Sequence, residues 1–200
     1  MTTIETTTTT TTETIPAAPG KRVVIAFFSL TGNTKHVADR IRSVFLSHGT
    51  QVSSVELFDV TGPIQAPNDV FANADVIGIG CLAWWLREPT GLRNWISEVP
   101  DQHLKGKKAF VFATCGGMVG YTASNVTKAL AAKGAVVVGE SSYVCPENYS
   151  LEIPKVGQPA QKPWSDKVRS DIDAWAEKIF PMLVGEKPAK GISGSGIRSE

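Results

Sequence analysis

The chain has 200 residues, of which 42% are apolar, and its formal net charge at pH 7 is +1. This length and composition favour one compact domain with a single substantial core. The near-zero charge gives no electrostatic reason to expect binding to nucleic acid or to an anionic membrane surface. No apolar run approaches the ~18 residues that a membrane-spanning helix needs, so we expect no membrane partner.

The two ends of the chain differ in composition from its middle. Residues 1–20 contain the threonine tract Thr6–Thr12 and lack both the basic start and the apolar core of a secretory signal. Such a segment cannot bury enough apolar surface to fold, so we expect a disordered tail. Residues 183–200 carry Gly and Ser and predict a second flexible tail, which leaves residues 21–182 as the folded domain.

Between these ends, apolar runs alternate with segments whose apolar residues recur at helical spacing. The expected strands are residues 23–28, 52–58, 76–81 and 109–113, and a run that begins at residue 135. The expected helices are residues 33–48, a segment begun by Pro89, residues 122–133, and a last segment marked by Val168, Ile172, Trp175 and Ile179. Five nearly continuous apolar strands separated by helices predict a doubly wound α/β domain, with a parallel sheet covered on both faces.

The cysteines, Cys81, Cys115 and Cys145, are widely spaced and include no Cys-x-x-Cys pair. Their odd number and their spacing argue against a disulfide framework, a zinc site or an iron–sulfur cluster held by this chain alone. We therefore expect no metal site and a reducing, cytoplasmic location. All three fall at or just after expected strand ends, and we interpret them as small buried apolar side chains rather than as reactive thiols.

The turn after the first strand reads Ser29-Leu30-Thr31-Gly32-Asn33-Thr34 and leads directly into a helix. Such a turn presents free backbone N–H groups, hydroxyls and the positive end of a helix dipole to one point, which is an arrangement that binds a phosphate group. It contains no Lys or Arg, so hydrogen bonds alone would hold the anion, which favours a permanently bound cofactor over a turned-over nucleotide. The alternative is that Ser and Thr merely cap the helix, but the turn holds more polar groups than a cap needs.

Two further loops follow strand ends, where ligands bind in sheets of this kind. Leu82-Ala83-Trp84-Trp85 follows the third strand, and Thr114-Cys115-Gly116-Gly117 begins a loop that ends at Tyr121. A phosphate-binding turn beside aromatic planes describes a site for a ring system on a phosphorylated tail. The tryptophans could instead be a core anchor and a surface aromatic, or belong to a partner interface, and the two glycines could simply make a turn.

The motif Ser29-x-Thr31-Gly32-Asn33-Thr34 resembles the phosphate loop of the flavodoxin family, whose members bind FMN non-covalently and transfer electrons. The resemblance extends over about residues 21–181 in strand order and loop placement. It implies sheet order 2-1-3-4-5 in a three-layer αβα arrangement. The segment from Thr114 to Tyr149, with its Pro146-Glu147-Asn148-Tyr149, is most similar to flavodoxin domains fused to a cysteine-rich ferredoxin domain. This chain has no cysteine after Cys145, so it would be the flavin part alone.

The resemblance also implies roles for the three loops. The expected phosphate-binding loop comprises Ser29, Leu30, Thr31, Gly32, Asn33 and Thr34. Trp84 and Trp85, with the adjacent Leu82 and Ala83, would border one face of the isoalloxazine ring. Cys115, Gly116, Gly117 and Tyr121, with Thr114, would border its other side or its pyrimidine edge. No residue is expected to be catalytic, because nothing in the sequence resembles a nucleophilic triad or a general-base pair.

Two features depart from the family pattern. Well-known flavodoxins are strongly acidic, whereas this chain is nearly neutral, so docking on basic partners is not expected. The second loop of those proteins commonly contains a glycine whose peptide flips on reduction of the flavin. Here the loop carries Ala83, and alanine resists a positive φ.

Three functions remain open from the sequence. The first is an FMN electron carrier between a reductase and an acceptor enzyme. The second is an FMN-dependent reductase that takes hydride from NAD(P)H to a quinone or another small acceptor. The third is a flavodoxin-like interaction module without a cofactor, which the intact phosphate loop makes the least favoured.

Overall fold

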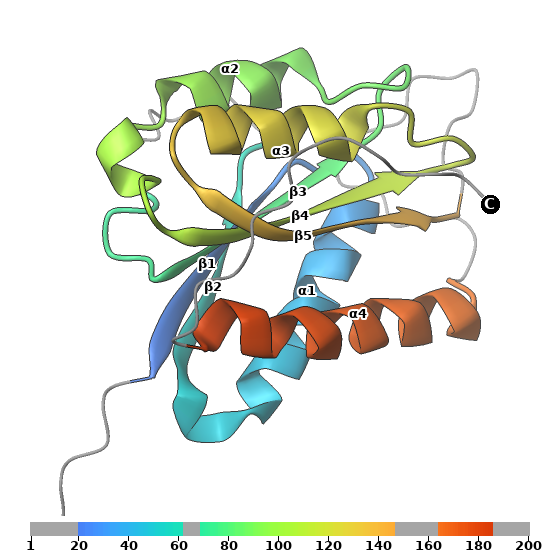
Figure 1. Cartoon of the computed structure of the whole chain (residues 1–200). Helices are drawn as coiled ribbons and strands as arrows, with labels where there is room; N and C mark the ends of the chain where they lie inside the picture. The colour runs from blue at the N-terminus through green and yellow to red at the C-terminus, as the bar shows by residue number, and fades with distance from the viewer. Residues whose placement is uncertain (1–19, 62–68, 147–163, 186–200) are drawn as a thin grey trace, which may run out of the picture.

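The computed structural model describes residues 20–61, 69–146 and 164–185, in which strands and helices alternate along the chain (Figure 1). In chain order the elements are β1 (Lys21–Phe27), α1 (Asn33–Ser47), β2 (Val52–Asp59), β3 (Val76–Leu82), α2 (Thr90–Glu98), β4 (Lys108–Cys115), α3 (Thr122–Ala132), β5 (Val136–Val144) and α4 (Asp166–Val184), with 3-10 turns at Gly49–Gln51 and Asp101–His103. Every strand pairing is parallel, and the order is β2-β1-β3-β4-β5. The expected doubly wound fold and its strand order are confirmed.

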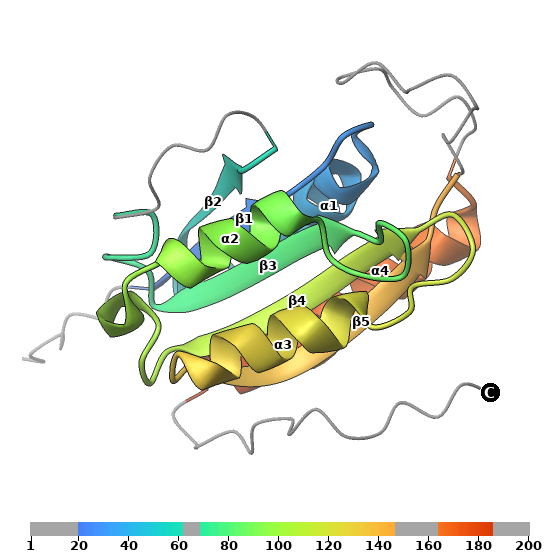
Figure 2. The same cartoon turned by 90° about the horizontal axis from the view of Figure 1, so that it is seen from above.

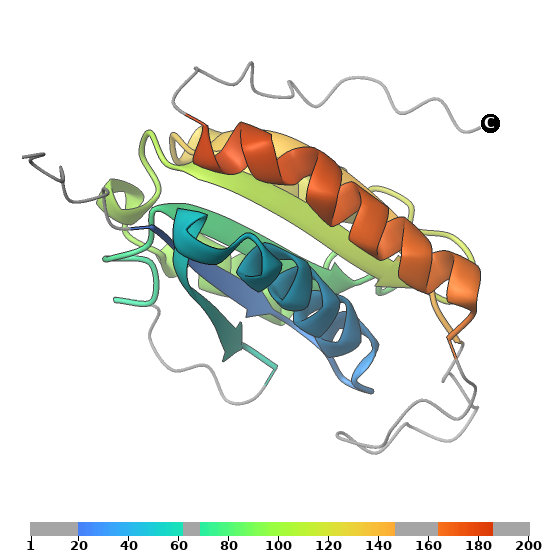
Figure 3. The same ribbon diagram turned by 90° about the horizontal axis from the view of Figure 1, so that it is seen from below.

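The sheet is the middle of three layers. Helices α2 and α3 cover one face, which Figure 2 views from above, and α1 and α4 cover the other, which Figure 3 views from below. Because all the strands are parallel, their carboxyl ends meet at one edge of the sheet, where ligands bind in open α/β folds. This edge carries all three loops that the sequence singles out.

Each face of the sheet has its own apolar core. Ile79 of β3 packs with Trp95 of α2 and Leu130 of α3 on one side. Ile25 of β1 packs with Phe45 of α1 on the other. A strand that is buried on both faces has no solvent side, which is why these strands read as continuous apolar runs in the sequence.

Two glycines of β3 leave room for rings from β4. A Cβ atom on Gly78 would lie 2.4 Å from the Phe110 ring, and one on Gly80 would lie 2.2 Å from the Phe112 ring. Both phenylalanines are fully buried. The glycines are therefore part of the packing of the central strands.

We expect Gly80→Ala to lower the free energy of unfolding by about 2–3 kcal/mol, because the added methyl group must displace a buried ring in a close-packed core. Urea unfolding at equilibrium measures this loss. The matched control is Gly91→Ala in α2, where the nearest atom would lie at an ordinary 3.5 Å and alanine is the better helix former. Equal stabilities of Gly80→Ala and the wild type would contradict the prediction.

Residues 1–19 and 186–200, which make up most of the two expected tails, lie outside the described residues. Helix α4 continues to Val184, so the domain boundary expected after residue 182 falls inside a helix. The physical reason is burial: Leu183 is 2% exposed and packs in the core beneath α1 and α4.

Candidate functional site

The first loop connects β1 to α1 at the carboxyl edge of the sheet. The backbone N–H of Ser29 donates to Thr61 Oγ1 (2.7 Å), and Ser29 Oγ accepts from the backbone N–H of Lys35 (3.2 Å). Gly32 at the helix N-cap has φ +88°, a conformation that glycine adopts readily. Within the described residues, the backbone N–H groups of residues 30–34 have no acceptor. The loop therefore presents a row of open donors at a helix N-terminus.

Two side chains of this loop fasten it to the neighbouring loops. Thr34 Oγ1 and Thr114 Oγ1 share a hydrogen bond of 2.9 Å, and both residues are 1% exposed. Asn33 Nδ2 donates to the Pro146 carbonyl oxygen (3.0 Å) and lies 3.2 Å from Cys145 Sγ. The Asn33 and Thr34 side chains, which the family resemblance assigns to a phosphate, make these internal contacts. The backbone N–H groups of the two residues have no acceptor among the described residues.

The second loop closes on itself as a hairpin. Trp84 and Arg87 exchange two backbone hydrogen bonds of 2.7 and 3.2 Å. The two residues between them, Trp85 and Leu86, have φ values of +51° and +65°. Positive φ at both central positions is typical of type I′ turns, which favour Asn-Gly and strain bulky residues. The strain thus falls on Trp85 and Leu86, and not on Ala83 as the sequence suggests, and it displays Trp85 with 79% of its surface exposed.

The third loop supports this hairpin. Gly120 has φ +58°, and a Cβ atom there would lie 2.4 Å from both the Cβ and the carbonyl oxygen of Leu86. The backbone N–H of Tyr121 donates to that same oxygen (2.9 Å). Only a glycine permits this close approach of two backbones, so Gly120 joins the second and third loops.

The three loops together line one pocket of about 300 Å³. The lining contains all the expected site residues except Gly32 and Tyr121, namely Ser29, Leu30, Thr31, Asn33, Thr34, Leu82, Ala83, Trp84, Trp85, Thr114, Cys115, Gly116 and Gly117. Tyr121 is 68% exposed and lies outside the lining. Cys145 and Pro146, which the sequence analysis did not assign to the site, complete it, whereas Glu147 to Tyr149 lie outside the described residues. No charged side chain is among the described residues that line the pocket.

The cysteines divide between core and pocket. Cys81 is fully buried between the sheet and the α2–α3 layer, and burial raises the pKa of its thiol. Cys115 and Cys145 line the pocket; burial raises the pKa of both, that of Cys145 to about 12. Because the thiolate is the reactive form, these shifts disfavour reaction of the three thiols at neutral pH.

Glu88 anchors the far end of the hairpin. It is 7% exposed, and its carboxylate accepts from Arg93 Nε (2.5 Å) and from Asn125 Nδ2 of α3 (2.9 Å). Burial opposes the charged form, but the hydrogen bonds from Asn125 and Arg93 prevail and lower the pKa of Glu88. The second loop is thus tied to both α2 and α3.

We expect Glu88→Gln to lower the free energy of unfolding by about 1–3 kcal/mol near neutral pH. The pKa of Glu88 is lower in the folded chain than in the unfolded one, so its charge stabilises the fold above the unfolded pKa, and this contribution is lost as pH falls through the folded pKa. Urea unfolding of both proteins at neutral and acidic pH measures the difference, which should narrow in acid. Glu98→Gln, on the exposed side of α2, is the control; a loss independent of pH would contradict the assignment.

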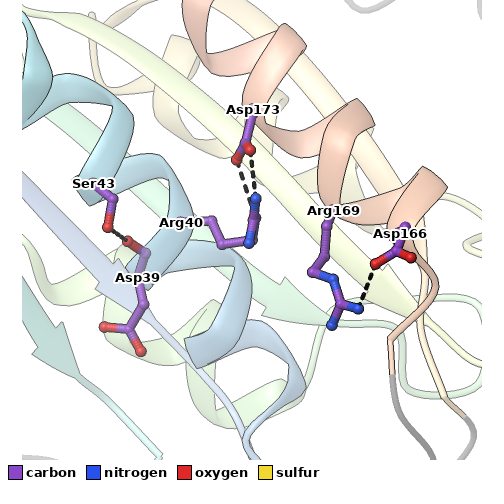
Figure 4. A network of polar contacts seen from close by, with 6 residues as sticks. All are labelled: Asp39, Arg40, Ser43, Asp166, Arg169 and Asp173. Carbon is purple, nitrogen blue, oxygen red and sulfur yellow. Dashed lines mark hydrogen bonds and ion pairs between the residues drawn. The ribbon is translucent and has the colours of Figure 1, made fainter.

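An ion pair joins helices α1 and α4 away from the pocket lining, and a second one lies within α4 (Figure 4). The Arg40 guanidinium contacts both carboxylate oxygens of Asp173, and Arg169 pairs with Asp166 (2.7 Å) within α4. His36, in the first turn of α1, packs its ring against Trp164 at 4.8 Å. Burial, then Arg40 and Arg169, lower the pKa of His36. It is therefore a neutral packing residue outside the pocket lining.

Two features are absent from the described residues. These residues contain no group of three or more His, Cys, Asp or Glu side chains arranged to hold a metal ion. They also contain no helix with the length and apolar character needed to cross a bilayer.

Solved structures similar to this chain include several flavodoxins. The two-electron reduced flavodoxin of Megasphaera elsdenii is 24% identical, with 78% of this chain and 98% of that one covered and a TM-score of 0.54. Flavodoxin 1 of Bacillus cereus is 21% identical, with 80% and 97% covered and a TM-score of 0.57. The chain has a flavodoxin-like fold. The resemblance stated from the first loop is thereby confirmed at the level of the fold.

The flavodoxin-like chain is also similar to an NADH:FMN oxidoreductase solved in its apo form. Their identity is 18%, with 87% of this chain and 95% of that one covered and a TM-score of 0.61. No protein-family model matches the sequence. Similarity at these identities establishes architecture, so any function must be argued from the pocket itself.

Proposed function

We propose that this chain binds FMN in the pocket at the carboxyl edge of its sheet and passes electrons between a reductase and an acceptor enzyme. The observation that carries the proposal is the composition of that pocket. Its lining includes first-loop residues Leu30, Thr31, Asn33 and Thr34, whose backbone N–H groups have no acceptor among the described residues, and the indoles of Trp84 and Trp85. Open N–H groups at a helix N-terminus suit a phosphate, and aromatic side chains suit a planar ring.

The residue types in the pocket suit both the phosphate and the ring of FMN. The backbone N–H groups of residues 30–34, with the hydroxyls of Ser29 and Thr31, would hold the phosphate. Trp84 and Trp85 would border the ring on one side, and Gly116 and Gly117 let backbone approach it on another. Bound FMN supplies the ability to accept and donate one or two electrons.

The described residues of the lining carry no charged side chain, which bears on the reduction potential of a bound flavin. The nearest ionisable groups in the lining, the Cys115 and Cys145 thiols, are held neutral by burial. The described residues of the lining therefore offer no cation that would stabilise negative charge on a reduced ring, and we expect a low reduction potential. The free thiols also favour a reducing compartment, and we propose the cytoplasm.

Absorbance spectroscopy of the purified protein tests the cofactor directly. We expect flavin bands, release of FMN by acid, and rebinding of added FMN much more tightly than of riboflavin, which lacks the phosphate. A colourless protein that fails to bind added FMN would overturn the proposal and leave a cofactor-free interaction module on the same fold.

A second candidate, an FMN-dependent NAD(P)H:quinone-type reductase, is favoured by the similarity to the NADH:FMN oxidoreductase. Anaerobic mixing of the FMN-loaded protein with NADH or NADPH distinguishes the electron carrier from the reductase. As a carrier the protein is reduced by dithionite or by a protein donor, while NAD(P)H oxidation is slow or absent. Sustained NAD(P)H consumption with a quinone would instead identify a reductase.

A further inference from the structure

Exposed apolar side chains gather around the mouth of the pocket. Of the large apolar residues that are exposed in the described part of the chain, Trp84, Trp85, Leu86, Met118, Tyr121 and Val144 all belong to the carboxyl edge of the sheet, and the others are Leu46 and Met182 on α1 and α4. We call Trp85, Leu86, Met118 and Tyr121 the apolar rim. Met118 and Tyr121 are 73% and 68% exposed. Clustered exposure of this kind marks an interaction site.

Backbone contacts fix the conformation of the apolar rim. The hairpin keeps Trp85 and Leu86 at positive φ, which costs free energy in each bulky residue. The Tyr121 N–H donates to the Leu86 carbonyl, and Gly120 packs against Leu86 with no space for a Cβ. A strained turn that is fastened from two sides displays its side chains with little loss of entropy on binding.

Among the described residues, the two loops that form the rim carry one exposed charged side chain, Arg87. Residues 82–88 and 115–122 contain a single carboxylate, Glu88, which is buried and bonded to Arg93 and Asn125. Arg87 is exposed, and its guanidinium has no partner among the described residues. A surface complementary to the rim is therefore apolar and carries a carboxylate that meets Arg87.

We propose that the apolar rim and Arg87 form a docking surface for a protein partner. The partner's contact surface would be an apolar patch bordered by acidic residues. This proposal rests on the proposed function, because the docked partner would exchange electrons with the bound FMN. Leu86, Arg87, Met118 and Tyr121 lie outside the pocket lining, so the surface is wider than a small acceptor needs. A second copy is disfavoured, because a two-fold contact would place cations together with no carboxylate from these loops to meet them.

Calorimetric titration with two small haem proteins of opposite surface charge tests the surface. The probes are the acidic soluble domain of cytochrome b5 and the basic cytochrome c. We expect the acidic probe to bind about tenfold or more tightly than the basic one, with an affinity that falls as salt rises. Equal binding of the two probes, or tighter binding of the basic one, would overturn the proposal.

Two matched pairs of variants locate the contact. Arg87→Glu and Met118→Ser are expected to weaken binding of the acidic probe by about tenfold and about threefold. Arg42→Glu on α1 and Met182→Ser on α4 change side chains that are also exposed but lie away from the rim, and they should leave binding unchanged. If the controls weaken binding as much as the rim variants, the rim is not the contact.

Two other outcomes count against a protein partner. Sedimentation that shows a dimer dissociated by Met118→Ser would assign the rim to self-association. Rim variants that alter only the KM for a benzoquinone would assign it to a small acceptor. The titrations are run on the protein with and without FMN, so a failure to bind FMN overturns the proposed function, whereas an FMN-loaded protein that ignores the acidic probe overturns only the docking surface.

Discussion

Thr31→Glu is expected to weaken FMN binding by about 100-fold, because a carboxylate placed among the open N–H groups of the first loop repels the phosphate and competes for those donors. Thr31 lines the pocket and has no side-chain hydrogen bond within the described residues. The change therefore removes no internal contact, and the apo-protein should unfold at the same urea concentration as the wild type. Fluorescence titration with FMN measures the loss.

Riboflavin makes this experiment specific to the phosphate. The Thr31→Glu variant should bind riboflavin as the wild type does, because riboflavin carries no phosphate for the new carboxylate to repel. Thr50→Glu, in the exposed 3-10 turn before β2, adds the same charge away from the pocket and should bind FMN normally. Equal loss of FMN and riboflavin in Thr31→Glu would show that the first loop does not hold the phosphate.

Gly120→Val is expected to lower the free energy of unfolding by about 3 kcal/mol or more and to release the second loop from the third. Two effects combine at this position. The backbone has φ +58°, which a β-branched residue resists, and a Cβ would lie 2.4 Å from backbone and Cβ atoms of Leu86. Neither the strain nor the clash can be relieved by rotating a flexible side chain.

Urea unfolding measures the stability, and the emission of Trp84 and Trp85 reports on the hairpin through changes in its exposure. Gly117→Ala is the control, because no atom lies within 4 Å of a Cβ at that position. It should change stability by no more than about 0.5 kcal/mol. If Gly120→Val were as stable as this control, the contact between the second and third loops would contribute nothing to the free energy of unfolding, and the prediction would be wrong.

The two functional proposals differ in how the pocket mouth is used. A carrier needs the edge of the flavin within reach of a docked protein, and the apolar rim supplies a fixed contact surface beside the pocket. A reductase needs space for nicotinamide over the ring. The strained Trp84–Arg87 hairpin therefore bears on both functions, and two residues outside the pocket lining, Gly120 and Glu88, help to fix its position.

The sequence by itself determined the α/β class, the strand order through the family resemblance, and the three loops that line the pocket. It could do so because buried parallel strands are apolar at nearly every position, and because a turn such as Ser29–Thr34 needs a local run of small polar residues. Both are signals between neighbours in the chain, so they can be read without knowing the fold.

The tertiary structure alone decided how those loops are held. Nothing local indicates that Asn33 contacts Pro146, that Thr34 bonds Thr114, or that Glu88 meets Asn125. These contacts join residues far apart in the chain, and each depends on which strand ends become neighbours at the edge of the sheet. The positive φ of Trp85 and Leu86 could not be predicted from the sequence either, because their residue types disfavour it. Contacts of Leu86 with Gly120 and Tyr121, which lie far along the chain, help to hold this conformation.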